Sequence, residues 1–381
     1  MTVVWLVIKI LIVTAFIQLA VAYLILLERK VAAYIQQRIG PNRAGWHGIL
    51  QPIADGVKFL LKEDFVPEGA NKFLHALAPA IAMVTAVLAF AVVPFGPTDP
   101  DNPDAPQFVI APGIDVGLLY IFSVSSLAVY AIVLGGWASN NKYSFLGGLR
   151  SAAQVISYEI PLGLGVLGVV LLARSLNLEQ IIAAQADRVW YVFYQPLGLL
   201  IFLTAAFAET NRAPFDLPEC EQELVGGYHT EYSGMKFALF FLGEYTHIIT
   251  VSYLTTILFF GGWDLPFVIS AQDQGFLAGL LKVLVLLIKA FCMILFMMWV
   301  RWTLPRFRFD QLMRLAWKAL IPLGLLNLAA TALLVHVARG FGLVDQFRVA
   351  VAYFWAVAAI VLIVAVGWLV RAGHRSELGT S

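Results

Sequence analysis

Charged side chains are scarce in this sequence of 381 residues. Asp, Glu, Lys and Arg make up 13% of it, whereas hydrophobic residues make up 60%. A soluble domain has about 25% charged and about 45–50% apolar residues. The composition therefore excludes an ordinary water-soluble enzyme and indicates a polytopic membrane protein. A net charge of +1 gives no reason to expect nucleic acid as a partner.

Cysteine and the common cofactor motifs are also scarce. The two cysteines, Cys220 and Cys292, form no CxxC pair, so neither a disulfide framework nor an iron–sulfur cluster is indicated. The sequence has no glycine-rich nucleotide loop, nucleophile elbow or metal-ligand cluster. His75 and His336 are isolated, and an interhelical hydrogen bond explains each better than haem ligation. We expect no flavin, haem, iron–sulfur or metal site, and no catalytic residue acting on this chain alone.

Long apolar runs fill most of the chain. A membrane span needs about 20 mainly apolar residues, and the first run lacks a signal-peptide cleavage site, so we expect it to be retained. The sequence predicts an all-α polytopic bundle of about nine transmembrane helices, in one integral membrane domain over residues 1–381. The predicted spans are 3–27, 73–95, 115–137, 151–173, 190–208, 236–261, 276–300, 316–337 and 348–370.

Basic residues are unevenly shared between the loops. Sixteen Lys and Arg fall in loops 28–72, 138–150, 209–236 and 301–318, whereas the alternate loops 96–114, 174–189, 262–275 and 338–348 hold four. Cytoplasmic loops of membrane proteins carry the excess of Lys and Arg. We therefore expect the N-terminus outside and the C-terminus in the cytoplasm.

An amphipathic helix is expected in the first cytoplasmic loop, around 47–63. Its polar and apolar residues fall on opposite sides at 100° per residue, and Pro52 is tolerable only near the first turn. By composition alone, the helix reads as an anchor in the membrane interface. A functional role would require it to wall a cavity. The polar side carries Gln51, Asp55, Lys58 and Lys62, and the apolar side Ile49, Ile53, Val57 and Leu60.

Acidic residues gather between two spans, in 208–234, beside the single early arginine Arg212. This run holds Glu209, Asp216, Glu219, Glu221, Glu223 and Glu231. Glu159, Glu209 and Glu244 lie on three consecutive predicted spans, and each lies toward the cytoplasmic half of its span. Intramembrane acids are costly unless hydrated, paired or used. Two interpretations stay open: a proton relay, or structural pairing of each acid with an arginine, Lys289 or a backbone donor.

Four segments carry a family resemblance. They resemble the membrane protein of respiratory complex I that forms the quinone chamber, the NADH dehydrogenase subunit 1 family, and the similarity spans roughly residues 3–337. The segments are 28–64 (beginning ERKVAAYIQQRIGPNRAG), 124–159 (ending SFLGGLRSAAQVISYE), 208–234 (AETNRAPFDLPECEQELVGGYHTEYSG) and 299–312 (WVRWTLPRFRFDQL).

The resemblance implies a function and assigns residues to it. The family joins the hydrophilic arm, which holds flavin and iron–sulfur clusters, to the small and antiporter-like membrane subunits of a proton-pumping NADH:quinone oxidoreductase in the bacterial plasma membrane. Quinone enters near the first span, the amphipathic helix and the sixth span. The implied quinone-binding residues are Glu28, Arg29, Arg38, Asp55, Phe215, Asp216 and Arg301. The implied proton-relay residues are Glu159, Glu209, Glu219, Glu221, Glu223 and Glu244.

This chain departs from the family at two places. Some members have a further glutamate where this sequence has Ser126, so a proton path must bypass that position. The ninth span, 348–370, extends beyond the family's eight. The choice between ubiquinone and menaquinone stays open. So do three alternatives: the equivalent subunit of a membrane-bound hydrogenase or F420H2 dehydrogenase, a stand-alone proton-coupled transporter, and a structural anchor, which leaves the three intramembrane acids unexplained.

Overall fold

The computed structural model describes residues 3–96, 108–186, 189–217, 225–265 and 276–340. Within these ranges, all the regular elements are helices. Seven helices are long and apolar enough to cross a membrane, and an eighth, α8, is apolar but shorter. The prediction of an all-α membrane bundle is therefore confirmed. The ninth predicted span, 348–370, lies outside the described residues.

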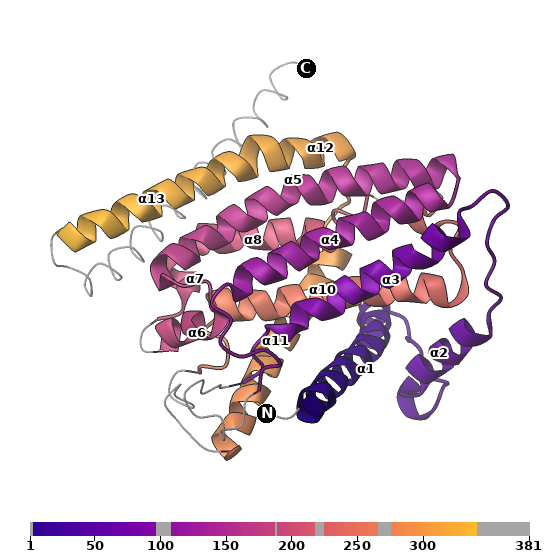
Figure 1. Ribbon diagram of the computed structural model, residues 1–381, viewed down its shortest axis with the longest axis horizontal. Helices are drawn as coiled ribbons and strands as arrows, with labels where there is room; N and C mark the ends of the chain where they lie inside the picture. Colours follow the sequence, from indigo (N-terminus) through magenta and orange to yellow (C-terminus); the bar gives the residue numbers. More distant parts are fainter. Residues whose placement is uncertain (1–2, 97–107, 187–188, 218–224, 266–275, 341–381) are drawn as a thin grey trace.

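The bundle is formed by helices lying roughly side by side, with α1 and α11 along one flank of α10 (Figure 1). The long helices are α1 (Val3–Ile35), α3 (Lys72–Leu88), α4 (Gly117–Ala138), α5 (Lys142–Ala173), α8 (Pro196–Glu209), α10 (Gly234–Phe259), α11 (Phe276–Thr303) and α13 (Ile321–Gly340). The shorter elements are η1 (Trp46–Gly48), α2 (Gln51–Leu61), η2 (Ala89–Ala91), α6 (Leu178–Ala186), α7 (Tyr191–Tyr194), η3 (Gly227–His229), α12 (Phe309–Arg314) and the π-helix η4 (Leu315–Leu320).

Helix α5 extends further than the predicted span 151–173. It begins at Lys142, because the Asn141 side chain caps it by accepting a hydrogen bond from the Tyr143 backbone N–H at 2.9 Å. Most of the predicted loop 138–150 is therefore helical. The added turns carry Gly147, where a Cβ would lie 2.8 Å from the Gly227 Cα. This close approach fixes the end of the acidic segment against α5.

The fifth span differs from the prediction of one helix over 190–208. The helix breaks at Gln195, between α7 and α8, and only the 14 residues of α8 continue toward Glu209. Gln195 is fully buried: its amide donates to the Thr331 hydroxyl at 2.8 Å and accepts from the Asn327 amide at 2.9 Å. These bonds to α13 satisfy the Gln195 side chain at the break, which would have no hydrogen-bond partner in the hydrocarbon of the membrane.

The core lies where α5, α8 and α10 meet. Tyr158, Phe202 and Phe259 are among its largest fully buried side chains. A Cβ at Gly165 would lie 3.0 Å from the Gly198 carbonyl oxygen, so α5 and α8 pack with small residues between their backbones. This packing places the end of α8, and the acidic segment after it, inside the bundle.

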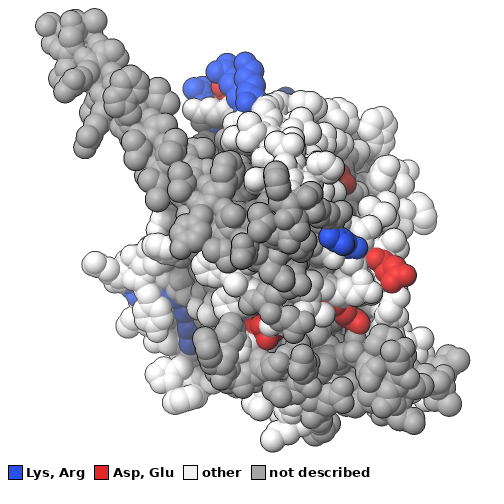
Figure 2. Space-filling view, turned by 90° about the vertical axis from the view of Figure 1, so that its left-hand side faces the viewer, with Lys and Arg blue, Asp and Glu red and all other residues white. Residues whose placement is uncertain are grey.

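The two ends of the bundle differ in charge. Figure 2 views the molecule from the left of Figure 1, the side on which α6 and α7 lie, and the described atoms of this face carry few charged side chains. Helix α2 and the 28–72 segment lie toward the other end in Figure 1. The 28–72 segment holds seven Lys and Arg.

Candidate functional site

A charged cavity of about 360 Å³ lies between α1, α10 and the end of α11. Glu28 is buried in its wall, 5% exposed, and forms an ion pair with Arg301. The structure thus brings together four of the seven predicted quinone-binding residues. The cavity is lined by Ile25, Glu28, Arg29, Ala32, Arg38, Pro41, Phe241, Tyr245, Arg301 and Trp302.

Arg212 is placed beside this cavity by a tight turn after α8. The Arg212 N–H donates to the Phe207 carbonyl, and the Phe215 N–H donates to the Arg212 carbonyl at 2.8 Å. From α5, the Gln154 side-chain amide donates to the carbonyls of Ala208 and Phe215, each at 2.8 Å. The first half of the acidic segment is therefore a buried, hydrogen-bonded turn that directs one cation inward.

The Arg212 guanidinium lies between two carboxylates from different helices. Its Nη1 is 3.3 Å from a Glu28 carboxylate oxygen on α1, and its Nη2 is 3.8 Å from one of Glu244 on α10. It also stacks over the Tyr245 ring at 4.1 Å. The Glu244 carboxylate in turn accepts a hydrogen bond from the Tyr228 hydroxyl at 3.0 Å. Arg212 thus connects Glu28, in the wall of the charged cavity, to Glu244, which does not line that cavity.

A second cavity, of about 280 Å³ and mostly apolar, adjoins the charged one. We call it the α2 cavity because α2 forms one wall, opposite α1 and α10. Ile25 and Phe241 line both cavities, so the two are neighbours. Its residues are Gln18, Ala22, Ile25, Pro52, Asp55, Gly56, Phe59, Leu60, Met235, Ala238, Phe241 and Leu242. The amphipathic helix α2 therefore forms the wall of a cavity, which is the condition that a functional role beyond membrane anchoring requires.

Asp55 joins α2 to the rest of the site. Its carboxylate pairs with Arg29 on α1 at 2.6 Å and accepts from the Gln51 amide at 3.1 Å. Ile53 and Val57, on the opposite side of α2, are 59% and 48% exposed. An apolar side left uncovered suits a helix lying in the membrane interface. Helix α2 spans Gln51–Leu61, shorter than the predicted 47–63, and Pro52 lies in its first turn as predicted.

A third, smaller pocket of about 50 Å³ holds two of the predicted relay acids. Glu209 and Glu244 line it together with Tyr228 and His247. Ser125 lies within hydrogen-bonding reach of Glu209. We call this the acidic pocket. It lies between α3, α4, α5, α8 and α10.

Glu159 lies near this pocket but does not line it. Its carboxylate accepts a hydrogen bond from the Ser126 hydroxyl, and it faces outward from α5. The Phe122 carbonyl oxygen, 2.8 Å from the Ser126 hydroxyl oxygen, is the alternative acceptor for its single proton. The position at which the resemblance implies a glutamate in some family members therefore holds a hydroxyl in contact with Glu159, one of the predicted relay acids.

Two predicted quinone-binding residues line neither the charged nor the α2 cavity. The Phe215 ring is buried and stacks on Phe307 at 5.4 Å, and Asp216 pairs with Arg306 at 2.8 Å. Both tie the acidic segment to the residues between α11 and α12. Glu219, Glu221 and Glu223 lie outside the described residues.

The described hydrogen bonds of Lys289 are with backbone carbonyls and not with one of the predicted relay acids. Its ammonium donates to the carbonyls of Phe260, Gly262 and Asp264, at the end of α10. A cation is favourable at a helix C-terminus. Glu244, in contrast, does contact an arginine, Arg212. For this acid, structural pairing and a role in a proton relay are compatible.

Sequence reasoning did not assign a role to Arg212, Tyr228 or Tyr245. The signal for Arg212 was present, since it is the single arginine in a run of acids. The tyrosines gave no such signal, because a tyrosine beside a helix is usually a packing residue. Their contact with Glu244 and Arg212 depends on how α10 faces the turn after α8.

The sequence matches the NADH dehydrogenase family over residues 8–332. The chain belongs to this family. The matched region ends before the predicted ninth span. Among similar proteins, subunit 8 of the NADH-quinone oxidoreductase of Rhodothermus marinus is 50% identical over 83% of this chain and 92% of its own length.

Two further relatives are also named as subunits of an NADH-quinone oxidoreductase. The protein of Flavobacterium psychrophilum is 51% identical over 80% of this chain and 90% of its own length. That of Geobacter metallireducens is 48% identical over 86% of this chain and 95% of its own length. The expected family membership is thus confirmed across nearly the whole of the relatives' length.

Proposed function

We propose that this chain is the membrane component of a proton-translocating NADH:quinone oxidoreductase that surrounds the quinone and passes its charge changes to a proton relay. The observation that carries the proposal is the arrangement Glu28–Arg212–Glu244, which extends from the charged cavity to the acidic pocket. The names of the relatives favour the quinone enzymes over the hydrogenase and F420H2 alternatives.

The two adjoining cavities suit the two parts of a membrane quinone. The isoprenoid tail is apolar, and the α2 cavity is lined mainly by apolar side chains. The headgroup carries carbonyl oxygens, and the charged cavity offers arginine donors and the Tyr245 hydroxyl. We infer that the tail occupies the α2 cavity, while the headgroup passes the charged cavity toward partner subunits. Quinone is the substrate, and ubiquinone and menaquinone fit this description equally.

The charge coupling follows from simple electrostatics. Two-electron reduction of quinone takes up two protons, which changes the charge near Glu28. A unit charge 4 Å away is worth about 4 kcal/mol at an effective dielectric of about 20. While Glu28 holds a proton on its way to the quinone, Arg212 loses that partner and its attraction turns to Glu244. The attraction favours the charged carboxylate, so Glu244 releases a proton on the side facing Glu209 and the relay.

The partner subunits follow from what this chain must connect. The electron donors, flavin and iron–sulfur clusters, belong to hydrophilic subunits over the charged cavity. Small membrane subunits and antiporter-like subunits receive the proton signal beyond Glu159, whose outward-facing carboxylate needs a polar partner in the bilayer. The excess of Lys and Arg in one set of loops supports an orientation with the N-terminus outside the bacterial plasma membrane and the C-terminus in the cytoplasm.

Carboxylate replacement tests the proposal. Glu159→Gln, Glu209→Gln and Glu244→Gln should each lower quinone reductase turnover and proton pumping in inside-out vesicles. NADH oxidation by a soluble acceptor should be unchanged, since those electrons never reach the membrane. Unchanged turnover and pumping in all three variants would rule the relay out.

A further inference from the structure

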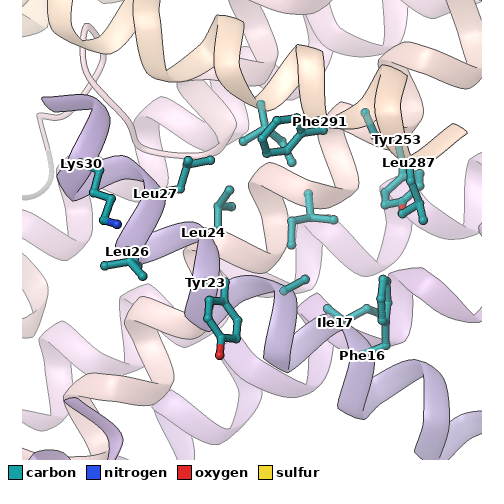
Figure 3. A pocket seen from close by; sticks show the side chains of 14 residues that line it. Phe16, Ile17, Tyr23, Leu24, Leu26, Leu27, Lys30, Tyr253, Leu287 and Phe291 are labelled. Atoms are coloured by element: carbon teal, nitrogen blue, oxygen red, sulfur yellow. The ribbon is translucent and has the colours of Figure 1, made fainter. Parts of the chain in front are cut away.

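An apolar groove of about 410 Å³ lies on the other side of α1 from the α2 cavity. Its walls are α1 and α11, and Ile249 and Tyr253 of α10 also line it. Figure 3 shows Tyr253 beside Leu287 of α11. Phe16, Ala20, Leu24 and Leu27 follow one face of α1, at helical spacings of three and four. The stripe on α11 is Leu287, Ala290, Phe291 and Ile294.

The groove is separate from the proposed quinone path. The α2 cavity shares Ile25 and Phe241 with the charged cavity, whereas the groove shares no lining residue with the charged cavity. On α1, the groove takes Phe16, Ala20 and Leu24, whereas the α2 cavity takes Gln18, Ala22 and Ile25 on the other side of the helix. A second apolar ligand can therefore occupy the groove while a quinone tail occupies the α2 cavity.

One end of the groove is marked by a cation and the interface. Lys30 is the charged residue among the 14 that line it. The Lys30 ammonium donates to the His47 carbonyl at 2.5 Å, and an ammonium has three donors. Beside His47, Trp46 is 77% exposed. Exposed tryptophans and lysines of this kind lie at the headgroup level of a bilayer.

The length of the groove matches one membrane leaflet. Phe16 and Lys30 are 14 residues apart on α1, which is about 21 Å along the helix. Half the hydrocarbon core is about 15 Å, and the headgroup region adds about 5–7 Å. An acyl chain reaching to Phe16 therefore has its phosphate beside Lys30.

We propose that this groove is a binding site for a phospholipid of the leaflet on the side of Lys30. One acyl chain lies between α1 and α11 over Ile249 and Tyr253, and the lipid phosphate accepts hydrogen bonds from the Lys30 ammonium. Small side chains at Ala20 and Ala290 leave room for the chain. The bound lipid fills the gap between α1 and α11 and packs against the side of α1 that faces away from the α2 cavity.

The test uses the intact complex purified from membranes. A phosphatidylglycerol with a photoreactive diazirine at the end of one acyl chain is added, and labelled residues are identified by mass spectrometry. We expect labelling near Phe16 and on the facing α11 stripe in the unaltered complex. Ala20→Trp, which fills the groove, should lower this labelling at least fivefold. Leu19→Trp is the matched control, since Leu19 is 58% exposed and lies outside the groove.

Lys30→Gln tests the headgroup and should lower labelling about threefold, whereas Lys318→Gln, at an exposed lysine of η4, should not. Absence of labelling near Phe16 in the unaltered complex would overturn the proposal without any variant having to fold. So would equal labelling of the Ala20→Trp and Leu19→Trp complexes, or preferential labelling by a photoreactive isoprenoid quinone. Quinone reductase activity, measured in parallel, tests the proposed function separately.

Discussion

The Arg212 guanidinium lies among buried acids, so its removal leaves them without their cation. Breaking a buried pair by removing one partner costs about 3–5 kcal/mol. At the residue scale, this makes Arg212 the position at which the charged cavity and the acidic pocket depend on each other. Tyr245 contacts Arg212 in the middle of the arrangement, and Tyr228 donates a hydrogen bond to Glu244 at one end.

Arg212→Gln should lower NADH:quinone reductase activity tenfold or more, because Glu28 and Glu244 lose the charge between them. Arg212→Lys should fall between this variant and the unaltered enzyme, since lysine keeps the charge without the forked geometry. Inside-out vesicles provide the measurement, with NADH oxidation by a soluble acceptor as the check on assembly. Arg314→Gln, at an exposed arginine of α12, is the control. Equal activity in Arg212→Gln and Arg314→Gln would contradict the assignment.

Ser126→Ala should impair pumping, because the Glu159 carboxylate loses its hydroxyl donor. A hydrogen bond to a charged group is worth about 1.5–3 kcal/mol, and we expect a reduction of about threefold or more. Ser123→Ala is a close control on the same helix, since the Ser123 hydroxyl donates to the Leu119 carbonyl. If both variants pump alike, the Ser126–Glu159 contact has no part in the relay.

Among the elements, α2 offers a position at which a larger side chain can fill the α2 cavity without a steric clash. Gly56 lines the α2 cavity, and a Cβ built on it would have no neighbour within 4 Å. Gly56→Leu therefore adds a side chain to the cavity without displacing backbone. It also raises helix propensity by nearly 1 kcal/mol, so a loss of activity is not explained by a weaker helix.

Gly56→Leu should raise the KM for a long-tailed quinone severalfold and change kcat less. Gly163→Leu on α5 is the matched control, because a Cβ there also has open space around it. Steady-state kinetics with quinones of short and long tails make the measurement. An unchanged KM for the long-tailed quinone would show that the tail does not pass α2.

The elements also show what a sequence can and cannot predict. Helix α2 was predictable, because its two faces differ in polarity and Pro52 marks its start. The break at Gln195 was not, because the apolar composition continues through it. Its cause is a set of buried hydrogen bonds to Asn327 and Thr331, more than 130 residues away.

The acids of the site were also predictable from the sequence, because a carboxylate in an apolar helix is conspicuous. Their partners were not. Glu28, Arg212 and Glu244 come from α1, the turn after α8, and α10, so only packing brings them together. Phe215 and Asp216 show the converse, since family motifs placed them at the quinone whereas their described contacts are with Phe307 and Arg306.

At the scale of the whole molecule, the loop charges predict how the chain lies in the membrane. In a background without Cys220 and Cys292, a cysteine at Glu68 should react with a membrane-impermeant maleimide in inside-out vesicles. A cysteine at Asp115 should react in intact spheroplasts instead. The reason is that Lys and Arg are retained on the cytoplasmic side. The reverse labelling pattern would invert the proposed orientation.

If a charge change at the quinone reaches Glu244 through Arg212, infrared difference spectroscopy of the intact complex should detect it at the Glu244 carboxyl group. Reduction of bound quinone should produce a carboxyl band that disappears in Glu244→Gln and is thereby assigned to Glu244. This band should weaken or vanish in Arg212→Gln at equal quinone reduction, because the charge change no longer reaches Glu244. A Glu244 band of unchanged size in Arg212→Gln would contradict this role of Arg212.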